Sequence, residues 1–336
     1  MTVILVGHRP SMVSQLDKLA VLKDGALEAF GVNQDSPLSG FVTRSGDTNT
    51  TLPGRSGVVD TFVWNPGDDN DTVEGQAGID TMRFNGANVS ESVDISANGE
   101  RVRFSRDIAS VTMDLNDVER IDFNALGGAD NIVVNDLSGT DVADVNVDLG
   151  AAGGGGDGAA DKVTVTGTSG DDVVNVFSTG TEVDVFGLSA QVSAKNFETA
   201  NDKLVVNGGA GDDALIATGP TGVTLDGGDG DDILIGGDGD DVLIGGPGDD
   251  VLIGGAGNDV LDPGDGDNVV IQGFVAGAAT EDRIDLRGVA GATDFDWVMA
   301  HAQDVGGNAV IDLGNGAHMT LTDVTTAALS SDDFLL

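Results

Sequence analysis

Apolar and polar residues alternate in short runs along most of the chain. From residue 58 to about residue 197, short Val-, Ile- and Phe-containing strands are separated by turns of Gly, Asp and Asn, for example at residues 102–104, 111–115, 132–134 and 163–165. Short strands with turn signals at this density indicate an all-β sandwich or solenoid.

The pattern becomes strictly periodic further along. Four nine-residue units begin at residues 227, 236, 245 and 254, each a Gly- and Asp-rich stretch followed by β-forming residues. Their sixth positions hold Asp232, Asp241, Asp250 and Asp259. A detached copy precedes them at residues 208–216, and a degenerate copy with Asn268 in its sixth position follows at 263–271.

The period itself predicts a geometry. If one unit is a half-turn of a flattened coil, units 18 residues apart stack about 4.8 Å from one another. Asp232 then lies over Asp250, and Asp241 over Asp259. Carboxylates this close repel one another unless a cation neutralises them. The ten-residue gap between residues 216 and 227 is expected to break this register, which would keep Asp213 from stacking on Asp232.

Composition and charge support an acidic, turn-rich β protein. Among 336 residues, 57 are acidic and 15 are basic, so the formal net charge is −42, and there is no cysteine. This charge argues against a nucleic-acid partner. The missing cysteine excludes disulfides and Cys-ligated metals. Gly and Asp disfavour a helix bundle, and 40% apolar residues argue against acidic disorder.

The repeats resemble the RTX (repeat-in-toxin), or hemolysin-type calcium-binding, nonapeptide GGxGxDxUx. The resemblance implies a parallel β-roll that binds several Ca²⁺ ions, and oxygen ligands suit calcium. It implies carboxylate ligands from Asp232, Asp241, Asp250 and Asp259, and less firmly from Asp213. Main-chain carbonyls would come from Gly228, Gly230, Gly237, Gly239, Gly246, Gly248, Gly255 and Gly257. The neutral Asn268 should weaken the site above Asp250.

Fainter copies at residues 66–83 and 167–175 carry Asp71, Asp80 and Asp172. The sequence leaves open whether they bind calcium or are vestigial turns.

The head of the chain is different. Residues 1–31 have no net charge and predict a strand at 3–6, a helix from Ser11 and a hairpin of residues 19–22 and 26–31. They resemble the C-terminal end of a type I secretion ABC-transporter ATPase, with His8 in the place of its switch histidine. Because no GxxxxGK loop is present, ATP hydrolysis is not expected.

The predicted fold is all-β: a parallel β-roll or β-solenoid of nonapeptide repeats, with a further β-rich N-terminal region and a small C-terminal cap. The expected parts are an ABC-ATPase-like remnant (1–31), a linker (32–60), a degenerate solenoid (61–200), the calcium-binding β-roll (201–272), and a cap with a secretion signal (273–336). Within the last part we expect a helix near 294–304 and a hairpin of residues 310–313 and 318–321.

Export is expected to use the C-terminal region. The start of the chain lacks the features of a Sec signal peptide, and no apolar run reaches the roughly 20 residues of a transmembrane helix. Residues 332–336 resemble an uncleaved type I secretion signal, although they could instead be a capping strand. The expected partners are calcium and the type I secretion machinery, and the expected location is extracellular or on the cell surface.

No complete enzyme motif is found, since HExxH, GxSxG and the P-loop are all missing. The main expectation is therefore a non-enzymatic, secreted calcium-binding protein with a structural, surface or adhesive role. The many aspartates make any carboxylate pair uninformative, so a polysaccharide lyase or epimerase with an RTX export module stays open as the alternative. The extracellular ligand cannot be deduced from the sequence.

Overall fold

The computed structural model describes the backbone of residues 18–23, 26–32 and 41–44, and residues 51–336 except 55, 58, 271–273, 275, 277–281 and 315. Contacts divide the chain into two units. Unit 1 comprises residues 1–161 and 192–196, and unit 2 comprises residues 162–191 and 197–336. The predicted strand at 3–6, the helix from Ser11, and His8 lie outside the described residues.

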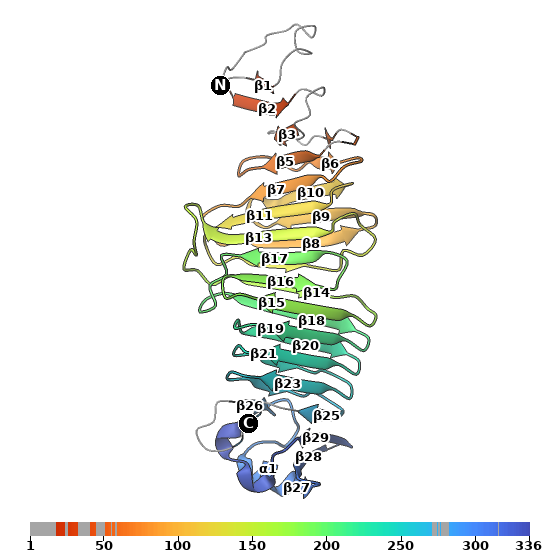
Figure 1. The fold of residues 1–336 in the computed structure, drawn as a ribbon, viewed down its shortest axis with the longest axis vertical. Coiled ribbons are helices and arrows are strands. Elements are labelled where there is room, and N and C mark those ends of the chain that lie inside the picture. Colours follow the sequence, from red (N-terminus) through yellow and green to blue (C-terminus); the bar gives the residue numbers. More distant parts are fainter. Residues whose placement is uncertain are drawn as a thin grey trace. The chain divides into compact units, whose positions relative to one another are not determined.

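Unit 1 is built from two stacks of strands (Figure 1). The first stack is parallel and contains β3 (Phe41–Arg44), β5 (Asp60–Trp64), β7 (Thr81–Asn85), β11 (Arg120–Leu126) and β13 (Asp144–Ala151), with β17 (Gln191–Lys195) beside β13. The predicted hairpin near the head is confirmed as β1 (Lys18–Lys23) and β2 (Ala26–Val32), which pair antiparallel.

The second stack of unit 1 contains an antiparallel insertion. Its parallel members are β4 (Thr51–Pro53), β6 (Thr72–Glu74) and β10 (Val111–Asn116), and β12 (Asn131–Val134) is parallel to β8 (Ser92–Asn98). Between them, β9 (Arg101–Arg106) runs antiparallel to both β8 and β10. The 3₁₀ helix η2 (Ile108–Ser110) joins β9 to β10.

Unit 2 contains the strict repeats. One stack is β15 (Val173–Ser178), β19 (Ala214–Thr218), β21 (Ile233–Gly237), β23 (Val251–Gly255), β25 (Asp267–Val270) and β29 (Ala317–Leu321), all parallel. The other is β14 (Lys162–Thr166), β18 (Lys203–Ala210), β20 (Val223–Asp229), β22 (Val242–Ile244), β24 (Val260–Asp262), β26 (Arg283–Asp285) and β30 (Phe334–Leu335), also parallel. Successive half-turns therefore alternate between two parallel stacks, as in a β-roll.

The C-terminal elements add the last strand of each stack, and the helix expected near 294–304 ends earlier, at His301, because a strand begins at Ala302. Helix α1 (Phe295–His301) is capped by Asp294, whose carboxylate accepts the N–H of Trp297 at 2.9 Å. The predicted hairpin is confirmed as β28 (Asn308–Gly314) and β29, with β27 (Ala302–Val305) beside β28. Two 3₁₀ helices, η3 (Thr326–Ala328) and η4 (Ser331–Asp333), precede β30, and β16 (Glu182–Phe186) pairs antiparallel with β15.

The core follows from side-chain alternation along each strand. In unit 2 the middle residue of every repeat strand points inward, and Leu234, Leu243, Leu252 and Leu261 are at most 1% exposed. In unit 1 an aromatic stack of Trp64, Phe84, Phe104 and Phe123 fills the interior, with the Phe84 and Phe104 ring centroids 3.5 Å apart. The predicted all-β parallel β-roll is confirmed.

Close stacking also explains two glycines of the repeat that begins at residue 245. Gly246 and Gly248, in the second and fourth positions, have φ of +109° and +152°. A Cβ on either residue would collide with the carbonyl oxygen of the matching glycine one coil earlier, Gly228 or Gly230. Only glycine combines this backbone conformation with such a close approach.

Candidate calcium-binding site

The sixth-position aspartates, each just before a strand of unit 2, stack in two columns. In the first carboxylate column, the N–H of Asp213 donates to Oδ1 of Asp232 at 2.8 Å, and that of Asp232 donates to Oδ1 of Asp250 at 2.9 Å. Asp250 in turn donates to Oδ1 of Asn268 at 2.8 Å. Each residue thus fixes the side chain of the residue in the next coil, and the predicted stacking of Asp232 on Asp250 is confirmed.

The second carboxylate column lies at the opposite turns. The N–H of Asp241 donates to Oδ1 of Asp259 at 3.0 Å, and the N–H of Asp259 donates to Oδ1 of Asp282 at 3.2 Å. This column begins at Val223, whose N–H donates to Oδ1 of Asp241 at 2.8 Å. The predicted stacking of Asp241 on Asp259 is therefore also present.

One prediction about the register was wrong. Asp213 does stack on Asp232, because the ten-residue gap is a half-turn of the coil: β20 fills it and pairs with β18 and β22. That half-turn has Val223 opposite Asp241 of the next coil, so the coil continues without an acidic residue at this position and the nonapeptide signature is lost.

Each column leaves oxygens without a partner. The Oδ2 atoms of Asp213, Asp232, Asp241, Asp250 and Asp259 are buried and accept no hydrogen bond, and these residues are at most 1% exposed. Each Oδ2 lies over the first glycine of its own repeat. For example, a Cβ on Gly227 would collide with Oδ2 of Asp232 and would lie 2.8 Å from the carbonyl oxygen of Gly245. An orphaned carboxylate oxygen and a carbonyl oxygen of the next coil therefore face the same space.

The main-chain carbonyls that the sequence predicts as calcium ligands belong to the same glycine-rich turns as the carboxylate columns. Those of Gly228, Gly230, Gly237 and Gly239 point along the stack toward the glycines of the next coil, Gly246, Gly248, Gly255 and Gly257 respectively. Within the described part of the chain, no three acidic or histidine side chains converge as a metal-binding group. A cation at these turns would thus need main-chain oxygens in addition to the carboxylates.

Burial and mutual repulsion perturb these carboxyl groups. Desolvation is the main cause, and it raises the pKa of Asp241 and Asp250 to about 7 and that of Asp232 and Asp259 to about 6. Neighbouring carboxylates add to the shift: Asp259 raises the pKa of Asp241, and Asp232 raises that of Asp250. No lysine or arginine occurs between residues 204 and 282 to offset this charge. Buried, unpartnered oxygen donors of this kind fit Ca²⁺.

Protons should partly replace calcium at these sites. Since the pKa is higher in the folded chain than the usual 3.8, the folded state holds more protons between about pH 4 and pH 7, and the stability of the calcium-free fold falls as the pH rises through that window. We expect the calcium-free chain to gain β structure when the pH is lowered from about 8 to about 5. Far-UV circular dichroism in chelator checks this, and a signal independent of pH would contradict it.

A further acidic column, distinct from the two carboxylate columns, was not foreseen in the sequence. The exposed fifth-position residues Asp171, Asp212, Asp231 and Asp249 are linked by N–H to Oδ1 bonds of 2.8–3.0 Å that run opposite to those of the first carboxylate column. Asp282 was also missed, because its repeat has Ala278 and Thr280 in place of the second and fourth glycines. Residues 282–285 have the order Asp-x-apolar-x, which also begins at each sixth-position aspartate of the strict repeats. This order would have revealed Asp282 in the sequence.

The fainter copies occupy different environments. Asp172 heads the first carboxylate column, with its N–H donating to Oδ1 of Asp213 at 2.7 Å. Asp80 accepts the N–H of Asp60 at 2.7 Å and has an unpartnered Oδ2, and burial raises its pKa to about 6. The N–H of Asp71 instead approaches Sδ of Met113 at 3.2 Å. Calcium binding by these copies stays a prediction.

Comparison with known proteins agrees with this geometry. Residues 67–83, 224–252 and 235–270 match the family model of the RTX calcium-binding nonapeptide repeat, which holds four copies. The chain therefore contains RTX-type nonapeptide repeats, as predicted. Repeats of this family bind several Ca²⁺ ions, which confirms calcium as the cofactor.

Structural similarity to a solved lipase is weak. The extracellular lipase LipA from Serratia marcescens is similar over 88% of this chain and 38% of the lipase, at 16% identity and a TM-score of 0.24. The similar region thus spans less than half of the lipase. A search of curated proteins finds no match.

Proposed function

We propose that this protein is exported unfolded by a type I secretion system and folds outside the cell when calcium fills its two carboxylate columns. The observation that carries this proposal is the set of five buried Oδ2 atoms without partners, in a segment that has no basic residue. Because calcium binds the folded roll, its concentration controls folding through mass action. RTX-repeat proteins are typically secreted.

The ligands we propose are the carboxylates of Asp213, Asp232, Asp241, Asp250 and Asp259 and the carbonyls of the second and fourth glycines of each repeat. The neutral Asn268 at the end of the first carboxylate column supplies only an amide oxygen, so we expect weaker binding there. Calcium supplies the positive charge that makes these buried carboxylates compatible with the fold.

The C-terminal residues support export before folding. In the folded chain, β30 pairs with β26, and the carboxylate of Asp333 accepts the N–H of Ser330 at 2.6 Å, with Asp333 0% exposed. A secretion signal in this segment would therefore be accessible only in the unfolded chain. None of the described helices is long and apolar enough to cross a membrane.

A structural or surface role fits unit 1 better than catalysis. A cavity of about 760 Å³ there is lined by charged and amide side chains, including Arg83, Asp122 and Asn146. These groups bond to one another: Arg83 pairs with Asp122 at 3.0 Å, and Asn146 donates to the same carboxylate at 3.0 Å. Their engagement leaves little for substrate chemistry, so we favour a non-enzymatic role over a polysaccharide lyase or epimerase.

Export can be tested with a reporter protein co-expressed with a type I secretion system. Residues 281–336 fused to the reporter should send it into the medium, whereas residues 92–147, a segment of equal length, should not. Deleting residues 1–31 from the full chain should leave export unchanged. Retention of the 281–336 fusion, or loss of export on deleting residues 1–31, would contradict the assignment.

A further inference from the structure

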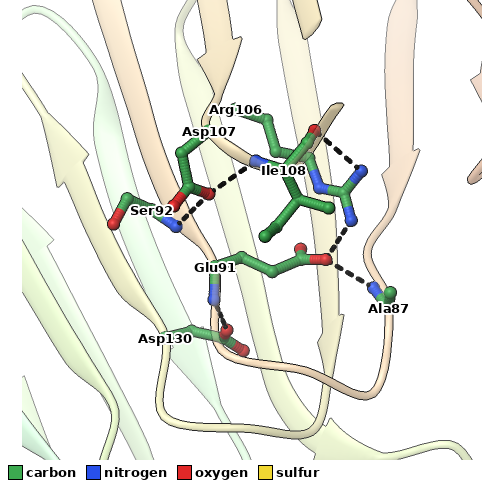
Figure 2. A network of polar contacts seen from close by, with 7 residues as sticks. All are labelled: Ala87, Glu91, Ser92, Arg106, Asp107, Ile108 and Asp130. Carbon is green, nitrogen blue, oxygen red and sulfur yellow. Dashed lines mark hydrogen bonds and ion pairs between the residues drawn. The ribbon is translucent and has the colours of Figure 1, made fainter. Parts of the chain in front are cut away.

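The carboxylate arrangement of the repeats recurs in unit 1, in coils that lack the nonapeptide. The N–H of Glu91 donates to Oδ1 of Asp130 at 2.7 Å (Figure 2), and that of Asp130 donates to Oδ1 of Asp161 at 2.7 Å. This is the bonding pattern of the two columns in unit 2. Glu91 and Asp130 are each 2% exposed.

These two residues also have oxygens without partners. Oε2 of Glu91 and Oδ2 of Asp130 are buried and accept no hydrogen bond. A Cβ on Gly86 would lie 2.7 Å from Oε2 of Glu91 and 2.9 Å from the carbonyl oxygen of Ala125. The same combination of orphaned carboxylate oxygen, next-coil carbonyl and glycine forms the candidate calcium sites of unit 2.

Arg106 brings a positive charge to one carboxylate oxygen of this cluster. Arg106 forms an ion pair with Oε1 of Glu91 (Figure 2), and its guanidinium lies 5.3 Å from the ring centroid of Trp64. Asp130 faces the carboxylates of Asp161 and Asp157 in addition to Glu91. The guanidinium of Arg106 contacts Oε1 of Glu91 and not the orphaned Oε2, and the carboxylates around Asp130 add negative charge there.

We propose that Glu91 and Asp130 form an additional divalent-cation site, outside the nonapeptide repeats, which Ca²⁺ occupies through Oε2 of Glu91, Oδ2 of Asp130 and the carbonyl of Ala125. Arg106 neutralises Oε1, the other carboxylate oxygen of Glu91. The proposal rests on the calcium binding proposed for the repeats, although its test is separate.

The tryptophans make ions bound in unit 1 near Trp64 observable apart from those in the repeats of unit 2, and the variants then assign the signal to this site. The chain has two tryptophans and no tyrosine, so in the full chain with Trp297→Phe only Trp64, beside Arg106, sensitises bound Tb³⁺. We expect sensitised Tb³⁺ emission that Ca²⁺ competes away. Asp130→Asn in this background should reduce the emission at least fivefold, and Glu91→Gln should act similarly. Asp141→Asn, an exposed charge-matched control, should leave it unchanged.

Asparagine suits the test because Asn268 already occupies the equivalent place in the first carboxylate column with its Oδ1 bond intact. Circular dichroism of the same samples reports folding of the repeats. If the repeats respond to calcium and Trp64 sensitises no Tb³⁺, or Asp130→Asn emits as strongly as its parent, this site is refuted while the proposed function stands. If the repeats themselves ignore calcium, the proposed function fails.

Discussion

Removing calcium should unfold residues 204–272. Seventeen acidic residues and no basic ones lie between residues 204 and 282, and the buried columns cannot all be ionised and remain stacked without a counter-ion. In chelator at about pH 8 we expect loss of β structure and a larger hydrodynamic radius. Both should be restored at the roughly 10⁻⁴–10⁻³ M calcium typical of extracellular calcium modules.

Far-UV circular dichroism and small-angle scattering measure these two changes. Magnesium at the same concentration is the control, because this smaller ion requires near-ideal octahedral geometry and gives up its water reluctantly. It should restore little structure. A β signal that is the same in chelator and in calcium would show that the columns are stable without an ion.

Replacing both Asp241 and Asp250 by asparagine should raise the calcium midpoint for folding at least tenfold. Each change removes one buried, unpartnered Oδ2 and keeps the Oδ1 acceptor, so the loss reports charge and coordination rather than packing. The matched control replaces Asp240 and Asp249, the exposed neighbours with the same charge, and should change the midpoint less than twofold. Calorimetric calcium titration of both double variants measures the difference.

The fainter copy at residues 66–83 should bind calcium less strongly than the strict repeats. Replacing Asp71 and Asp80 should weaken calcium uptake less than replacing Asp241 and Asp250, because only Asp80 of that pair has an orphaned oxygen. Equal losses for the two pairs would show that residues 66–83 form a full calcium site.

The strict repeat made much of the site predictable. A nine-residue period fixes which side chains face inward and which lie 18 residues apart, so Leu243 in the core and Asp241 over Asp259 follow from arithmetic and strand spacing. The glycine positions follow as well, because neighbouring coils are too close for a Cβ at Gly246.

The features that the sequence did not predict lie in coils that lack the nonapeptide sequence. Residues 217–226 read as a gap, yet they form a half-turn because Val223 and Leu225 still alternate inward. Glu91 and Asp130 read as isolated acids, since their turns have different lengths and the antiparallel β8–β9–β10 insertion separates them in sequence. Pairing across such insertions depends on tertiary contacts that a local pattern does not carry.

The position of the ions tests the central claim most directly. Anomalous scattering from crystals of the calcium-loaded protein should show ions beside Oδ2 of Asp232 and Asp250 at one edge of the roll, and beside Oδ2 of Asp241 and Asp259 at the other. Ions found only beside the exposed Asp231 and Asp249, or ordered columns with no ion at all, would contradict the account.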